Sequence, residues 1–325
     1  MTDQSSGSPG GSRDRSFDFA RYVGARRAGV LGGEEETTRY AYSADVAMLR
    51  TFKRIRPVEL AAAAVVRASK ELMRNQLLGR TVRVSPQQFP SVYKLAVECA
   101  ETLGVAVPAI YVANSPVINA YTSGTDDDAF IVIHSALVDA FEPDELKFVL
   151  GHETGHIQNK HVVYGTVLRM ILEGASLFLA WFATPAQVPL MAWYRRAEIT
   201  CDRAGLLCTG DLDAACRAFL KMAVGSRKLF EEMDVDAFVQ QAKEGRVGVG
   251  RLMEAFDTHP YLPKRIEALR VFADSALYRK AIGAGEGGLT MEEVDQKTSD
   301  IVQIMKAGPD DTDARNSGGH KGEQS

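Results

Sequence analysis

The clearest helical pattern in the chain covers residues 144–164 and contains no proline. Pro143 suits a first helical position, and the acidic residues that follow it put negative charge where the helix dipole favours it. One apolar face continues along the segment through Leu146, Val149, Leu150, Ile157 and Val162. The pattern predicts an amphipathic helix that also carries the polar run from His152 to His156.

Shorter patterns predict the neighbouring elements. Helices are expected over 59–78, 91–103 and 265–272, a short strand over 80–84, and an extended segment over 110–112. Residues 118–122 and 129–133, joined by a turn through 126–128, predict a β-hairpin. Together these elements indicate an α+β, mainly helical fold with a small β-hairpin or sheet beside the 144–164 helix.

Residues 170–193 contain one charged side chain, Glu173, over a length that could cross a bilayer. Pro185 and Pro189 are expected to break this segment, and the continuous apolar run over 175–183 is too short to span. We expect a hairpin that packs over the core of a soluble or peripheral cytoplasmic enzyme. The alternative is a membrane-embedded or re-entrant hairpin.

The polar run has the H-E-x-x-H pattern of zinc peptidases. His152 and His156 are separated on a helix by roughly 40° of rotation and about one turn of rise, so both imidazoles can bind one metal ion. Glu153 is placed to take a proton from a metal-bound water. The alternative is a pair of core histidines beside a buried, paired glutamate.

The third ligand that such a site needs does not follow on the same helix. The pattern H-E-x-x-H-x-x-G-x-x-H would require glycine at 159 and histidine at 162, where the chain has Asn159 and Val162. On a continuing helix, His161 would lie about 140° round from His156 and face away from the metal. It is therefore expected to be a surface or second-layer histidine.

Glu198 is the better candidate for the third ligand. A helix would place Glu198 and Asp202 on one face, where one carboxylate can bind the metal and the other can accept the free ring N–H of a ligating histidine. The alternative is a solvated charged helix with ordinary pairing between neighbouring turns. Cationic residues flank the pair: Arg195, Arg196 and Arg203.

Composition fits a folded enzyme and argues against one class of partner. The 325 residues are 46% hydrophobic and 25% charged, and the net charge of −4 gives no support to a nucleic-acid partner. The four cysteines show no C-x-x-C spacing. Besides Cys99, three of them lie in an expected helical region: Cys201, Cys208 and Cys216. We interpret these three as reduced core residues in a reducing compartment, and a second metal site formed by them is the less favoured alternative.

Four motifs follow one another in a fixed order: residues 119–124, the 144–146 lead into the H-E-x-x-H run, Glu198 with Asp202, and Thr258-His259-Pro260 with Arg265. Through them, over roughly residues 40–275, the chain resembles the HtpX-like zinc metallopeptidases, which include the CAAX prenyl proteases. The resemblance implies a zincin-like fold of gluzincin type. It also implies one Zn²⁺ per chain held by His152, His156 and Glu198, with Glu153 as general base and Asp202 behind a histidine ligand.

Four further site residues are expected partly from this resemblance. Asn119 and Ala120 would belong to an exposed strand edge that binds an extended peptide, whereas a turn-flanking asparagine is the alternative. His259 would donate a hydrogen bond to the oxyanion, and Arg265 would orient a carboxylate. The alternative for this pair is a turn histidine and a surface arginine.

The expected organisation is a disordered tail over 1–18, a helical region over 19–85, a catalytic domain over 86–275, and a C-terminal helix and disordered tail over 276–325. The expected function is a zinc metalloendopeptidase that cleaves polypeptides with a metal-activated water. A non-catalytic metal-bound scaffold or chaperone-like protein and a non-peptide amide hydrolase are the alternatives.

Overall fold

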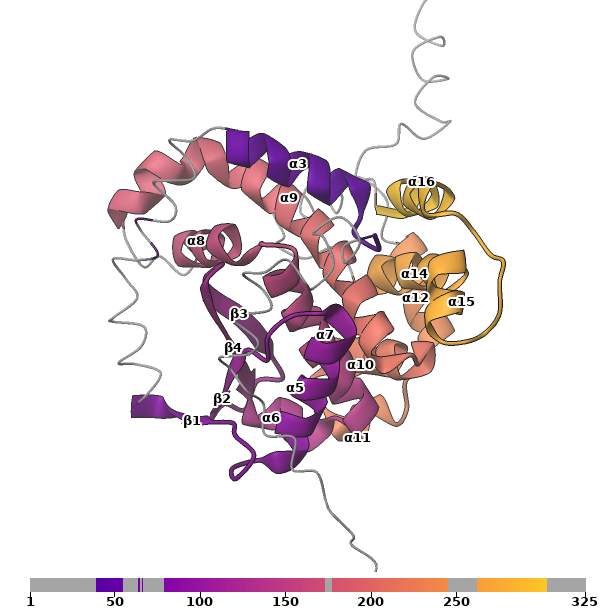
Figure 1. Cartoon of the computed structure of the whole chain (residues 1–325), viewed down its shortest axis with the longest axis horizontal. Helices are drawn as coiled ribbons and strands as arrows, with labels where there is room; N and C mark the ends of the chain where they lie inside the picture. The colour runs from indigo at the N-terminus through magenta and orange to yellow at the C-terminus, as the bar shows by residue number, and fades with distance from the viewer. Residues whose placement is uncertain are drawn as a thin grey trace, which may run out of the picture. The chain divides into compact units, whose positions relative to one another are not determined.

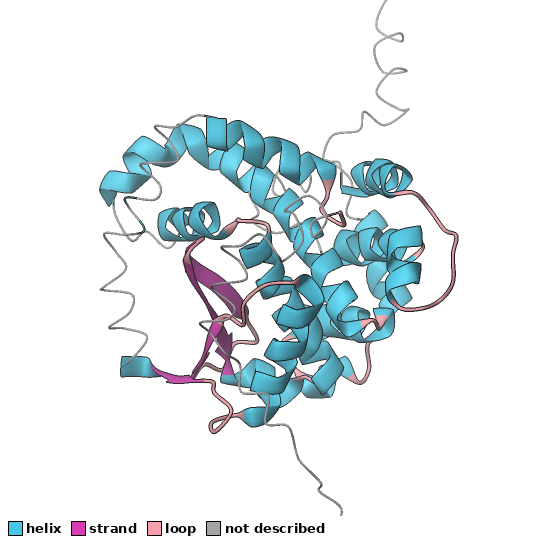
Figure 2. Ribbon diagram, in the orientation of Figure 1, coloured by secondary structure: helices cyan, strands magenta, loops and turns pink. Residues whose placement is uncertain are grey.

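The computed structural model describes residues 39–54, 64, 66, 79–172, 177–244 and 262–302. Figures 1 and 2 show that these residues form mostly helices around one small sheet, which confirms the expected α+β, mainly helical class. The expected terminal tails and most of the expected 59–78 helix lie outside the described residues. So do His259 and the motif around it.

The sheet has four strands in the order β1-β2-β4-β3, with bounds Thr81–Arg83 for β1, Ala109–Ala113 for β2, Ala120–Thr125 for β3 and Asp128–His134 for β4. β3 and β4 pair antiparallel, with Ala120 opposite Ile133, so the predicted hairpin is confirmed. β2 and β4 are parallel, and β1 joins β2 antiparallel. β4 is central, and its consecutive buried residues Ile131, Val132 and Ile133 fit a strand covered on both faces.

The helices of the described part are α3 (Ser43–Arg54), α5 (Pro90–Leu103), α6 (Ser135–Ala140), α7 (Pro143–Gln158), α8 (Val162–Leu172), α9 (Leu177–Thr209), α10 (Leu212–Val224), α11 (Arg227–Phe230), α12 (Val235–Glu244), α14 (Leu262–Ala273), α15 (Ala276–Ala281) and α16 (Met291–Val302). α7 packs against α5, α9 and α10 and also contacts β3. In Figure 1, α3 runs alongside α9, and α8 lies beside β3.

α7 is shorter than the sequence pattern indicates. It ends at Gln158, and Lys160 adopts a left-handed backbone with φ 59°. The His161 N–H then donates to the His156 carbonyl at 2.9 Å, a bond typical of a helix C-terminus that closes through a left-handed residue. The expectation of one helix to residue 164 was therefore wrong, because the cap turns the chain before α8 begins.

α9 corrects the expectation that prolines interrupt residues 170–193. The helix continues through Pro185 and Pro189 instead of forming a break there. A proline inside a helix removes one backbone hydrogen bond, but the buried residues Met191, Trp193 and Ala197 hold the turns that follow. In the part of the chain that the structure describes, no helix has both the length and the apolar character that a membrane span requires.

Small residues allow α7 and α9 to approach closely. A Cβ atom on Gly155 would lie 2.7 Å from the Cβ of Ala204, and one on Gly151 would lie 2.7 Å from the Cβ of Cys208. A Cβ atom on Gly205 of α9 would likewise lie 2.7 Å from the carbonyl oxygen of Phe148. Because backbones can come this near only without side chains between them, these glycines bring the polar residues of the two helices within reach of each other.

Candidate metal centre

The site begins on α7, whose start is fixed by its own polar residues. Glu142 and Glu145 form a capping box, and the buried Glu145 carboxylate also bonds to Lys221 at 2.6 Å and to Arg217 at 3.0 Å. Two turns further on, His152 and His156 are both buried, and their ring centroids lie 5.0 Å apart. The two imidazoles therefore share one face of α7, as the sequence predicts.

Glu198 reaches these histidines from α9. Its Oε1 lies 3.3 Å from His156 Nε2, and its Oε2 lies 3.7 Å from His152 Nε2. One ligand atom from each of these three residues lies within 4.8 Å of the others. Separations of this size suit nitrogen and oxygen atoms that surround one zinc ion at about 2.0–2.2 Å from the metal.

Asp202 and Arg265 contact His152 and Glu198 and fix their positions. Asp202 Oδ1 lies 3.0 Å from His152 Nδ1, the ring nitrogen that faces away from Glu198. Arg265 donates to both carboxylate oxygens of Asp202, at 2.6 and 2.8 Å, and its Nη1 lies 3.0 Å from Glu198 Oε2. Arg265 is 5% exposed, so the alternative of a surface arginine is wrong. Asp202 and Glu198 are buried as well, which excludes a solvated charged helix.

Burial and charge affect the two histidines differently. Burial alone would lower the pKa of His152, but the Glu198 and Asp202 carboxylates outweigh it and raise that pKa to about 10. For His156 burial dominates, and its pKa is lowered. Burial would also lower the pKa of Arg265, yet Asp202 and Glu198 raise it, so the guanidinium keeps its charge. His156 is further fixed by Tyr194, whose ring stacks on it at 5.6 Å between centroids.

Glu153 lies next to the histidines and faces the sheet. The hydroxyl of Thr122 on β3 lies 2.6 Å from Glu153 Oε2. Thr122 was not singled out from the sequence as a site residue. The sequence places Thr122 in the expected hairpin, but it does not indicate which residue of that strand contacts α7.

The donor chemistry of the site fits a divalent metal ion. Glu153, Glu198 and Asp202 are three buried carboxylates, and the Arg265 guanidinium that bonds two of them supplies only one positive charge. A buried excess of negative charge is costly unless a cation compensates it. Two imidazole nitrogens and a carboxylate are also a common ligand set for a catalytic zinc ion, which keeps one coordination position open.

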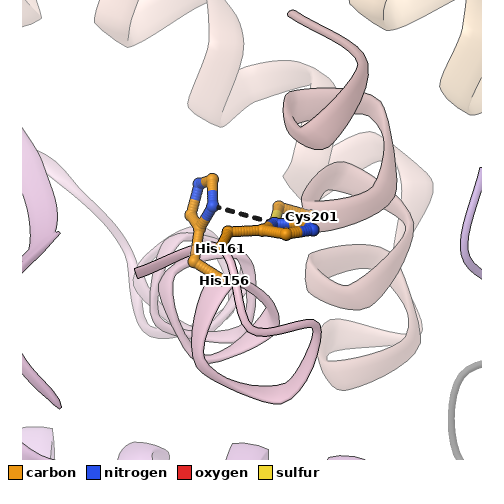
Figure 3. A group of neighbouring side chains, drawn as sticks. All are labelled: His156, His161 and Cys201. Atoms are coloured by element: carbon orange, nitrogen blue, oxygen red, sulfur yellow. Dashed lines mark hydrogen bonds between the residues drawn. The ribbon is translucent and has the colours of Figure 1, made fainter. Parts of the chain in front are cut away.

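His161 occupies a different place from the one expected. It is 1% exposed, and its Nδ1 lies 3.3 Å from His156 Nδ1 and 3.6 Å from Cys201 Sγ (Figure 3). The surface alternative was wrong, because α7 ends before His161 and the angle of a continuing helix does not apply there. The second-layer alternative fits the observed position.

The remaining predicted residues lie on or near β3. Asn119 is exposed, and its carbonyl accepts a hydrogen bond from the His134 N–H at 3.0 Å. Ala120 begins β3, which is the outer strand of the described sheet, next to α7 and α8. The ring of His134 pairs with the Val117 carbonyl at 3.0 Å and is not part of the histidine group on α7. The cysteines are free and buried, as expected.

Comparisons with known proteins show which family the chain is similar to. The sequence model of peptidase family M48 matches residues 86–273, more than half of the chain. A relative in Arabidopsis thaliana, the plastoglobule-localized metallopeptidase 48, chloroplastic, is 35% identical over 57% of this chain and 55% of its own length. The match thus spans only about half of that protein.

Two bacterial relatives are named protease HtpX homolog. The one from Bifidobacterium longum is 27% identical over 59% of this chain and 73% of its own length. The one from Pelotomaculum thermopropionicum is 26% identical over 60% of this chain and 80% of its own length. No solved structure matches the chain significantly.

Proposed function

The chain belongs to peptidase family M48, and from that membership we propose that it is a zinc-dependent metalloendopeptidase. One observation carries the proposal: the Nε2 atoms of His152 and His156 converge on the two carboxylate oxygens of Glu198, with Glu153 beside them. These residues lie on two helices that pack closely, so the group is held by the core of the fold.

His152, His156 and Glu198 would hold the metal. A zinc ion supplies a Lewis acid there, which polarises the scissile carbonyl and makes a water molecule nucleophilic near neutral pH. Asp202 would accept the Nδ1–H of His152 and so leave the Nε2 lone pair directed toward Glu198. Arg265 fixes Asp202 through two hydrogen bonds, which keeps this orientation.

Glu153 would act as the general base and then as the general acid. Its carboxylate takes a proton from the attacking water and passes it to the amide nitrogen as the carbon–nitrogen bond breaks. The bond from Thr122 holds this carboxylate on the side that faces β3. The prediction that His259 donates to the oxyanion stays a prediction, since His259 lies outside the described residues.

An extended peptide would bind along the outer edge of β3. Alternate residues of a strand direct their backbone groups to the same edge, and the Gly124 N–H bonds outward to Thr166 Oγ1 at 3.2 Å. Ala120 and Thr122 alternate with Gly124 and therefore face the same edge. This arrangement supports strand addition beside Glu153, with main-chain bonds giving affinity and little side-chain selectivity.

The first experiment is digestion of casein by the purified full chain, with and without a zinc chelator. We expect cleavage that the chelator abolishes and that added zinc restores, while Glu153→Gln stays inactive under every condition. A protein that binds zinc but cleaves no polypeptide would contradict the peptidase proposal and favour a scaffold or a non-peptide amide hydrolase. Comparing the peptides released in a cell extract by the native chain and by Glu153→Gln would then identify substrates.

A further inference from the structure

We propose that Asp45 and His161 together position the imidazole of His156, so that α3 contributes to the metal centre. The inference rests on the proposed function, since it assumes that His156 Nε2 binds a metal. α3 lies outside residues 86–273, the part of the chain that the M48 model matches. The two residues are positioning residues, because they act through His156.

Three buried side chains form a continuous row. His156 Nδ1 lies 3.3 Å from His161 Nδ1, and His161 Nε2 lies 3.0 Å from Asp45 Oδ2. His161 and Asp45 are each 1% exposed, so water does not compete for these contacts. Figure 3 shows the rings of His156 and His161 on the two sides of their contact, with Cys201 beside them.

The ionised carboxylate of Asp45 determines which ring nitrogens of His161 and His156 carry a proton. Burial would raise the pKa of Asp45, but its interactions with His161 and the hydrogen bonds from Thr200 and Trp193 outweigh burial and lower that pKa. An ionised carboxylate only accepts, so the proton of a neutral His161 belongs on Nε2. His161 Nδ1 then presents a lone pair, and we assign it as the acceptor of the His156 Nδ1–H.

This arrangement leaves the lone pair of His156 on Nε2, which is the nitrogen 3.3 Å from Glu198. The second nitrogen of a metal-binding histidine usually donates to a fixed acceptor, which sets the tautomer and the ring orientation. His152 has such an acceptor in Asp202. For His156, the acceptor is His161, and the contact with Asp45 fixes the position of His161.

Asp45 is itself attached to α9. Thr200 Oγ1 donates to Asp45 Oδ2 at 2.7 Å, and Trp193 Nε1 donates to Asp45 Oδ1 at 2.9 Å. Both donors are on the helix that carries Glu198. The row therefore ties a ligand on α7 to the helix that supplies another ligand, with α3 between them.

Cys201 suggests a competing reading, in which His156, His161 and Cys201 bind a second metal ion. Such an ion would require His156 to lose both ring protons. Burial and then the charges of Glu198, Asp45 and other nearby carboxylates raise the pKa of the Cys201 thiol. The row of His156, His161 and Asp45 does not require this loss of both ring protons, so we prefer it.

The main test compares two substitutions at His161 in the full-length protein. His161→Leu removes the acceptor, and zinc affinity, measured by competition with a chelator, should fall by about 10–100-fold. His161→Asn keeps an oxygen near the Nδ1 position and should recover much of that loss. Cobalt-substituted protein adds a spectroscopic readout, since the visible absorption bands should shift in His161→Leu and return toward native in His161→Asn.

A second comparison separates positioning by Asp45 from simple packing of α3. Asp45→Asn should weaken zinc binding, though less than His161→Leu, because it acts one contact further away. The control is Asp295→Ala, which removes the Asp295 bonds to the Ser43 N–H and to Arg203 without touching the row. Equal loss of zinc affinity in both variants would overturn the role of Asp45.

The remaining outcomes also decide the question. Unchanged zinc affinity and cobalt spectrum in His161→Leu would overturn the inference while leaving the proposed function intact, whereas a native chain without zinc would overturn the proposed function itself. Cys201→Ala should keep one zinc per chain with native affinity. Two ions per chain, one lost in both Cys201→Ala and His161→Leu, would establish the second metal site instead. If His161→Leu does not fold, His161→Asn and Asp45→Asn still carry the test.

Discussion

Thr122 and Glu153 connect the edge of the sheet to the metal helix. The Thr122 hydroxyl lies 2.6 Å from the Glu153 carboxylate and 3.1 Å from the Glu153 carbonyl oxygen. One hydroxyl hydrogen serves one acceptor at a time, and the shorter contact to a charged oxygen is the stronger bond. The strand proposed to hold the substrate therefore also orients the proposed base.

Thr122→Val should slow peptide cleavage while zinc content stays native. Losing a hydrogen bond to a charged group costs about 1.5–3 kcal/mol, so kcat should fall by a factor on the order of 10 to 100. Steady-state cleavage of a quenched fluorescent peptide measures this. Thr122→Ser keeps the hydroxyl and should cleave nearly as fast as the native chain. Equal kcat values for the valine and serine variants would remove Thr122 from the mechanism.

Purified protein should contain about one zinc per chain, because three protein ligands leave one open position on a tetrahedral ion. His152→Ala and His156→Ala should each lose the metal. Elemental analysis after gel filtration is the measurement, and far-UV circular dichroism checks that both variants remain helical. Stoichiometric zinc in both folded variants would mean that the metal binds elsewhere.

Glu153→Gln should separate the base from the ligands. The variant keeps His152, His156 and Glu198, so zinc should remain, while hydrolysis falls by a factor on the order of 10² or more. Zinc content and cleavage rate must be measured on the same preparation. Cleavage near the native rate would show that another group removes the proton.

Glu198 and Asp202 should differ in severity. Glu198→Ala removes an oxygen from the proposed metal site and should abolish most zinc binding. Asp202→Asn weakens only the acceptor behind His152, so its loss should be about 10–100-fold in affinity or activity. Zinc titration of both folded variants tests the order. The reverse order would mean that Asp202, and not Glu198, is the ligand.

The parts of the site that the sequence predicts are those set by one local geometry. His152, Glu153 and His156 follow from helix periodicity, and Glu198 and Asp202 share a face for the same reason. The β3–β4 hairpin also follows from local patterning, and the structure starts β3 at Ala120, two residues later than the pattern indicates.

The parts that the sequence does not predict depend on contacts between distant segments. The predicted place of His161 assumes a continuing helix, but the left-handed Lys160 ends α7 before that residue. Asp45 lies far from the metal motif in sequence, and no spacing rule relates α3 to α7. Pro185 and Pro189 indicate a break by local propensity, but packing of the later turns of α9 overrides that preference.

The glycines between α7 and α9 offer a test of how strictly the fold sets the site. A Cβ on Gly155 would meet Ala204 at 2.7 Å, so Gly155→Ala should destabilise the protein by about 1–3 kcal/mol through overpacking. Urea unfolding of the metal-free protein measures this without a contribution from zinc. Gly79→Ala is the control, because a Cβ there meets nothing within 4 Å. Equal stability of the two variants would show that the helices can separate at little cost.

One short stretch of α9 carries four side chains that each contact other elements of the fold. Glu198 faces the histidines of α7, and Thr200 donates a hydrogen bond to Asp45. Asp202 contacts His152 and Arg265, and Arg203 bonds to Asp295 of α16. Inserting a single residue after Glu198 would rotate the later three by about 100° relative to it. No change of rotamer could recover all of these contacts together. Between residues 198 and 203, the length of the chain is therefore constrained more tightly than the identity of any one side chain.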